Sequence, residues 1–282
     1  MARILSILVG LFFTAGLTWS LLVGLFNFEM PHSVEKDFHK HPKELHLSSD
    51  GAFGKFDRQQ LQRGFQVYKE VCSACHSLRL VAFRDLAALG YNEAEVKAIA
   101  KGFQVPGIDP ATGEVNSRPG IATDYFPKPF ANDIAARAAN NNAIPPDLSL
   151  MTKARHDGPA YVYSLLTGYA DPATYKNEQG KALPKENYPP ATGHFNPYFA
   201  NLNLAMAPPL TSEGQVQYGE GSPKPTVDQM ARDVAAFLVW TAEPKLEKRK
   251  QTGWPVLGFL LFATILGFLA FKNVWADKKK KA

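Results

Sequence analysis

The chain's only two cysteines lie within five residues, in the sequence Cys72-Ser73-Ala74-Cys75-His76. A C-x-x-C-H pattern is typical of covalent c-type haem attachment, in which each thiol adds across a vinyl group of the porphyrin. His76 follows directly, so its imidazole is placed to ligate the iron on the proximal face. The motif therefore predicts one haem c, held through Cys72 and Cys75. A chain that binds so large a planar group must wrap part of its core around it.

Two other kinds of site use the same cysteine spacing, and neither has further support in this sequence. A thioredoxin-like redox pair normally lies in a βαβ unit, whose pattern is missing here. A zinc knuckle needs two more Cys or His ligands at short spacing. With both cysteines assigned to the haem, none is left for a disulfide. Because covalent haem is attached on the outward side of an inner membrane, the haem domain is expected in the periplasm.

The formal net charge of +5 is unevenly distributed along the chain. Residues 28–244 contain 21 Lys and Arg against 24 Asp and Glu, so this stretch is mildly acidic. The basic excess lies near the ends of the chain, chiefly at 245–250 and 278–281. This distribution argues against nucleic acid as a partner and suits a basic protein partner, because complementary charge raises the encounter rate.

An uncharged run of 17 residues near the C-terminus, 255–271, is flanked by Trp254 and Trp275. That length is at the short end for a membrane-spanning helix, and tryptophan is enriched where such helices meet the membrane surface. The run therefore predicts a membrane span embedded in lipid. The expected divisions are a basic linker at 245–253, a transmembrane helix at 254–275 and a cytoplasmic basic tail at 276–282.

A second apolar run, within residues 1–28, begins after a single basic residue, Arg3. It is either a cleavable signal peptide or a retained signal-anchor helix. Its apolar core is long for a signal, and no small-x-small cleavage site follows, which favours retention. In both cases it exports the part of the chain that follows, so residues 29–244 are expected to form a periplasmic haem domain.

Helix signals occur at five places in the exported domain. Capping residues are expected at Asp57, Asn92, Asn132 and Thr226, and a fifth helix is expected after Asp157. The helix after Asp57 leads directly into the C-x-x-C-H motif. The sequence thus predicts a mainly α fold, a cytochrome c-like haem domain with large loop insertions and a membrane helix towards each end.

Two long stretches, 103–130 and 171–225, show no helical periodicity. Irregular segments of that length inside a compact domain are usually functional or wrapped around a ligand. Met206 lies in the second stretch, in a loop stiffened by two prolines, where a weak thioether ligand would be held in position. His156 and His194 are alternative sixth ligands, and Met151 is placed to pack over the haem edge. An open iron would instead suit gas binding or peroxidase chemistry.

Several motifs together resemble the cytochrome c1 family, and they follow one another in order from about residue 61 to 275. They are RGFQVY at 63–68, CSACH at 72–76, RPG at 118–120, DYFP at 124–127, AANN at 138–141, PPDLS at 145–149, YSLLTGY at 163–169, FNPYF at 195–199 and MAPP at 206–209. As a set these blocks are highly specific. They leave the first 50 residues and most of 103–117 and 171–194 uncovered.

The resemblance implies roles for individual residues of the haem site. Met206 would be the distal ligand, which agrees with its place in a stiff loop, and the pair with His76 would give the high reduction potential of an electron carrier. Arg155 would pair with a haem propionate, because a guanidinium matches a carboxylate at two points. The residues implied to form the wall of the haem pocket are Tyr161, Pro145, Pro146 and Tyr125.

The resemblance also implies a function, as the c-type haem subunit of a membrane quinol:cytochrome c oxidoreductase, the cytochrome bc1 complex. Its partners would be cytochrome b, a Rieske iron–sulfur protein as electron donor and cytochrome c as acceptor, in a dimeric complex. The chain would relay electrons and have no catalytic residues of its own. The alternatives are a stand-alone membrane-anchored cytochrome c that feeds a terminal oxidase, and a haem sensor or peroxidase.

Overall fold

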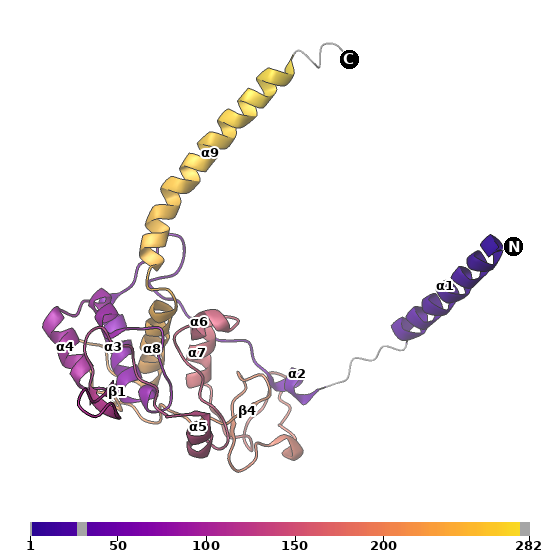
Figure 1. Ribbon diagram of the computed structural model, residues 1–282. Coiled ribbons are helices and arrows are strands. Elements are labelled where there is room, and N and C mark those ends of the chain that lie inside the picture. Colours follow the sequence, from indigo (N-terminus) through magenta and orange to yellow (C-terminus); the bar gives the residue numbers. More distant parts are fainter. Residues whose placement is uncertain (1, 27–32, 277–282) are drawn as a thin grey trace. The chain divides into compact units, whose positions relative to one another are not determined.

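The structure, a computed structural model, describes residues 2–26 and 33–276 (Figure 1). Its contacts divide the chain into two units, and the boundary between them in the sequence falls between Phe38 and His39. The first unit contains α1 (Ala2–Phe26), an apolar helix, and the short α2 (Val34–Phe38). The second unit contains the C-x-x-C-H motif, and it holds the remaining helices and strands.

The second unit is mainly α-helical, as predicted. Two helices form its centre, α3 (Arg58–Glu70) and α8 (Val227–Ala242). The other helices are η1 (Cys72–Ala74), η2 (Phe83–Leu89), α4 (Glu93–Lys101), α5 (Asp133–Ala139), α6 (Met151–Ala154), α7 (Gly158–Leu166), η3 (Lys185–Asn187) and α9 (Leu246–Ala276).

Four of these helices begin at the capping residues expected from the sequence. The side chains of Asp57, Asn92, Asn132 and Thr226 each accept a hydrogen bond from a backbone N–H in the first turn of the helix that follows. Such bonds satisfy donors that have no partner inside the helix. The fifth expected helix is α7, which follows Asp157.

Two short antiparallel hairpins interrupt the stretches expected to be irregular. β1 (Gln104–Ile108) pairs with β2 (Val115–Pro119), and β3 (His194–Phe195) pairs with β4 (Asn203–Leu204). Most side chains of β1 and β2 are exposed. Val105 alone among their residues is buried, and one buried side chain does not produce the alternation of apolar and polar residues that reveals a strand in the sequence.

The core is built where α3 crosses α8 at close range. Gly64 allows this approach, because a Cβ atom at that position would lie 2.0 Å from the backbone oxygen of Asp233. Next to it, the ring of Phe237 packs on those of Phe65 and Tyr68, with centroids 5.7 and 5.8 Å apart. The crossing therefore fixes the helix that leads into the haem motif.

The C-terminal helix differs from the sequence prediction at its start. α9 begins at Leu246, so the basic segment assigned to a linker forms the first turns of the same helix that carries the apolar run. That segment contains no glycine or proline before Gly253, and Glu247 in the first turn favours a helix start. Both α1 and α9 are long and apolar enough to cross a membrane.

Candidate haem site

The C-x-x-C-H motif forms a tight turn directly after α3. The backbone N–H groups of Cys75 and His76 both donate to the carbonyl of Cys72, at 3.1 and 2.9 Å. The hydroxyl of Tyr68, buried in the core, donates to the carbonyl of His76 at 3.0 Å. The turn therefore holds both thiols and the imidazole in one short segment that is attached to the core.

The imidazole of His76 is oriented by a residue 70 positions away. Its Nδ1 lies 2.8 Å from the carbonyl oxygen of Pro146. Because a carbonyl can only accept, Nδ1 carries the proton, and the lone pair of Nε2 is free to ligate a metal. Burial lowers the pKa of His76, against the opposing effect of the Pro146 carbonyl, and this favours the neutral imidazole that a metal needs.

Asp147 fastens the Pro146 segment to the motif. Its carboxylate accepts hydrogen bonds from Ser77 Oγ at 2.8 Å, from the backbone N–H of Arg79 at 2.9 Å and from that of Ser149 at 3.0 Å. The backbone N–H of Leu148 also donates to the carbonyl of Ser77, at 2.9 Å. We did not predict a role for Asp147, although an Asp side chain often accepts from the backbone N–H two residues further on, as it does here from Ser149.

Replacing Asp147 with asparagine should lower the free energy of unfolding at neutral pH by about 1–3 kcal/mol, because it weakens hydrogen bonds to a charged acceptor. Burial alone would raise the pKa of Asp147, but the bonds from Arg79, Ser149 and Ser77 outweigh it and the pKa is lowered. A lowered pKa stabilises the fold above the ordinary value of about 3.9, and this contribution is lost as pH falls through the lower folded pKa.

Chemical unfolding of the wild type and of Asp147→Asn at pH 7 and in acid measures this contribution. The difference between the two proteins should shrink as the pH falls below about 4. An equal difference at both pH values would show that the ionised carboxylate is not what holds the segment.

The predicted distal side is organised around Tyr169. Its hydroxyl donates to the backbone carbonyl of Met206 at 3.0 Å. Burial raises the pKa of Tyr169, with a smaller contribution from the neighbouring Tyr161. The hydroxyl is thus protonated at all physiological pH values and remains a donor. Tyr169 is a residue that our sequence analysis missed; it ends the YSLLTGY block, which carried no separate signal for it.

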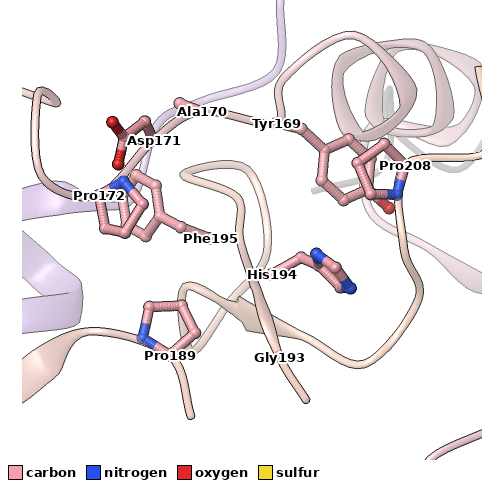
Figure 2. Close-up of a pocket in the computed structure, with 9 residues that line it drawn as sticks. All are labelled: Tyr169, Ala170, Asp171, Pro172, Pro189, Gly193, His194, Phe195 and Pro208. Carbon is pink, nitrogen blue, oxygen red and sulfur yellow. The ribbon is translucent and has the colours of Figure 1, made fainter. Parts of the chain in front are cut away.

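A surface cavity of about 390 Å³ lies beside this loop. Figure 2 shows Tyr169, His194 and Pro208 on one side of it and Pro172, Pro189 and Phe195 on the other. The rings of His194 and Tyr169 meet edge to face, with centroids 6.5 Å apart. His194, an alternative ligand in the sequence, therefore lies close to the Met206 loop.

The other residues predicted to contact the haem are Arg155, Tyr161, Tyr125 and Pro145. Arg155 is exposed, and its guanidinium interacts with the hydroxyl of the half-buried Tyr161, so the structure brings these two together. Tyr125 is 52% exposed and forms an isolated β-bridge with Ala82. Their contacts with a haem stay predictions, as do those of the half-buried Pro145.

His156 is a poor candidate for the sixth ligand. Its Nδ1 lies 3.0 Å from a carboxylate oxygen of Asp157, and this partner raises the pKa of the exposed imidazole. A raised pKa favours the protonated ring, which has no lone pair for a metal. The structure thus argues against His156, whereas His194 lies beside the Met206 loop.

The donors and the nearby apolar surface fit a covalent haem c. Cys72 and Cys75 are free thiols, and His76 offers Nε2. Desolvation raises the pKa of Cys72 to about 12, whereas the reactive cysteine of a redox C-x-x-C pair has a lowered pKa. Beside the motif, Leu80 and Leu150 are 52% and 46% exposed, which suits packing against an apolar ring.

Comparisons with known proteins agree with this site. Residues 47–278 match the model of a family described as the Cytochrome C1 family. The chain is 46% identical to "Cytochrome c1" of Rhodospirillum rubrum over 237 residues, which cover 81% of this chain and 85% of that protein. It is 39% identical to "Cytochrome c1 1, heme protein, mitochondrial" of Arabidopsis thaliana over 263 residues, 92% of this chain and 81% of that protein.

A third relative has a longer chain. "Cytochrome b/c1" of Bradyrhizobium diazoefficiens is 44% identical over 248 residues, which cover 80% of this chain but 34% of that protein. The similarities confirm the resemblance that the sequence motifs indicated.

Proposed function

Because this chain belongs to the cytochrome c1 family, it is an electron-transfer subunit of a cytochrome bc1 complex, and we propose that it relays electrons from a Rieske iron–sulfur protein to a cytochrome c. The haem c that such proteins carry supplies one-electron exchange at its iron. Both cysteines of this chain lie in the haem motif. No thiol is left to ligate an iron–sulfur cluster, so we assign the cluster to a partner subunit.

The observation that carries this proposal is the orientation of His76 by Pro146. The bond at 2.8 Å presents a neutral imidazole through Nε2 before the iron arrives, and it raises the basicity of the ligand. We assign Met206 as the second ligand, with its loop held by Tyr169. A His/Met pair gives the high reduction potential that the last relay before cytochrome c needs.

We infer the arrangement in the membrane from the two apolar helices together with the haem, which is attached on the outward side. We assign α9 as the C-terminal span of an inner-membrane protein, with the haem domain at 29–244 in the periplasm and the basic tail at 276–282 in the cytoplasm. The segment 1–28, mostly α1, is a signal or a retained anchor. The name of the Bradyrhizobium relative joins b and c1, which supports cytochrome b as a partner. We propose that the complex is dimeric.

Replacing Met206 with leucine tests the ligand assignment. The variant should lose the far-red thioether-to-iron charge-transfer band of the oxidised protein. Its midpoint potential should fall by a substantial part of the roughly 0.8 V range that axial ligands span. Absorption spectroscopy and redox titration of the purified membrane complex measure both, with Met151→Leu as the matched control. A wild-type protein without the band would refute the His/Met assignment. A haem subunit that purifies without a b-type cytochrome would refute its place in a cytochrome bc1 complex.

Removing the hydroxyl of Tyr169 should have a smaller effect on the same site. In Tyr169→Phe the Met206 carbonyl loses its donor, and one hydrogen bond is worth about 1 kcal/mol. Methionine should therefore detach at a lower temperature, which the loss of the charge-transfer band on heating reports. Tyr91→Phe, a hydroxyl removed elsewhere in the domain, is the control. Equal detachment temperatures in the wild type and Tyr169→Phe would show that the bond does not hold the loop.

A further inference from the structure

The loop at residues 49–56 is fastened to the first turns of α9. The Nζ group of Lys250 donates to the carbonyls of Ser49 and Gly54, at 2.7 and 3.3 Å. The backbone N–H of Phe56 donates to Glu247 Oε1 at 2.8 Å. Two charged side chains of α9 thus form hydrogen bonds with backbone groups of this loop, and these bonds hold the loop and the helix together.

The conformation of the 49–56 loop presents a phenylalanine at its tip. Gly51 has a φ of +67°, and a Cβ atom at Gly54 would lie 2.0 Å from the carbonyl oxygen of Asp50. These glycines allow a turn that most residues could not form. Between them, Phe53 is 78% exposed and stacks on Trp254 of α9, with centroids 5.1 Å apart and ring planes within 10° of each other.

Trp254 marks the polar–apolar boundary of α9. Basic residues occupy the helix before it, and the uncharged run 255–271 follows it directly. Tryptophan at such a boundary lies at the level of the lipid headgroups. Because Phe53 stacks on this ring, it lies at the same level, although it belongs to the haem domain and not to the helix.

The surroundings of this aromatic pair match a phospholipid surface. Lys55 is exposed and lines the same cavity as Phe53 and Trp254, and Lys248 is exposed in α9 before Trp254. Basic side chains near a membrane attract lipid phosphates. A small cavity of about 90 Å³ lies between the loop and the helix and is lined by Ala52, Phe53, Gly54, Lys55, Glu247, Lys250, Gln251 and Trp254. The apolar surface continues directly into the apolar run of α9, so lipid is the occupant that the chain itself indicates.

We propose that Phe53 inserts into the headgroup region of the bilayer and gives the haem domain a second membrane contact beside α9. The bonds from Lys250 and Glu247 hold the 49–56 loop against α9. A second contact at the same depth therefore attaches this edge of the haem domain to the membrane surface. The proposal rests on α9 as a membrane span, which its test examines separately.

Spin labels on the haem-loaded, full-length protein in its membrane complex, reconstituted into lipid bilayers, test the proposal. Both native cysteines are bonded to haem, so an introduced cysteine is the only free thiol of this chain, and the same complex without it measures any labelling of partner subunits. Labels go to Phe53→Cys, to Phe262→Cys in the apolar run of α9 and to Val115→Cys in β2, which is 81% exposed. In Figure 1, β1, the partner of β2, lies on the side of the domain away from α9.

Accessibility to oxygen, which concentrates in lipid, is compared with accessibility to a water-soluble nickel chelate. The oxygen-to-nickel ratio at position 53 should be several-fold higher than at 115 and lower than at 262. A ratio at 53 equal to that at 115 overturns the proposal, and if 262 still reports lipid, the span of α9 stands. Shielding of position 53 from both reagents also overturns it, in favour of contact with another subunit. Ala52→Cys, which keeps Phe53, serves if Phe53→Cys fails to assemble.

Discussion

Replacing Asp233 with leucine is expected to lower the free energy of unfolding of the haem domain by about 3–5 kcal/mol. Asp233 is fully buried in α8 and pairs with Arg63 of α3, whose Nε lies 2.9 Å from Oδ2. The amides of Gln60 and Gln229 donate to Oδ1 at 3.1 and 2.9 Å. Removing the carboxylate leaves a largely buried guanidinium and two amide donors without their acceptor.

The double variant Arg63→Met with Asp233→Leu separates the cost of an unpaired charge from the value of the pair. Replacing both partners of a buried ion pair with apolar residues is often neutral or stabilising. The double variant should therefore be more stable than Asp233→Leu alone. Chemical unfolding in detergent, followed by haem absorbance and circular dichroism, measures both. If the free energy of unfolding of Asp233→Leu were within about 1 kcal/mol of the wild-type value, the Arg63 guanidinium would have to become hydrated once its partner is removed.

Replacing Gly64 with alanine is expected to have a comparable effect at the same helix crossing. The new Cβ atom would lie 2.0 Å from the backbone oxygen of Asp233 and 2.7 Å from Cβ of Phe237. Neither neighbour is the flexible end of a side chain, so α3 and α8 must move apart. Overpacking of this kind costs about 1–3 kcal/mol and more where backbone has to shift.

The separation of α3 and α8 should also reach the haem motif, because α3 ends directly before Val71 and Cys72. We expect less covalent haem per polypeptide in Gly64→Ala, measured by haem staining against protein content. Gly219→Ala is the matched control, because no atom lies within 4 Å of its added Cβ and its φ is not positive. Equal stability and haem content in the two variants would contradict the close crossing.

Local features of this chain were predictable because they depend on residues a few positions apart. The C-x-x-C-H spacing predicted the haem, and the caps at Asp57, Asn92, Asn132 and Thr226 predicted where helices begin. Each of these caps bonds to a backbone N–H within the next three residues. The apolar run of α9 predicted a span in the same way, from consecutive residues.

The predictions that were wrong rest on weak patterns of apolar or charged residues in the sequence. The β1–β2 hairpin buries only Val105, so no alternation of apolar and polar residues revealed it. The basic segment before Trp254 was assigned to a linker because charge alone does not separate a loop from the solvated start of a helix. The structure shows it continuous with α9, where Glu247 and Lys250 bind the 49–56 loop.

The sequence by itself determined the chemistry of this protein: two thiols and an imidazole in one turn, with an apolar helix on each side of the haem domain. Only the tertiary structure decided which groups hold that chemistry in place. The carbonyl of Pro146 orients His76, and the carboxylate of Asp147 fastens the two segments, across about 70 residues. Tyr169 reaches Met206 across 37 residues. No short-range pattern encodes such partners, because the folding of the intervening chain brings them together.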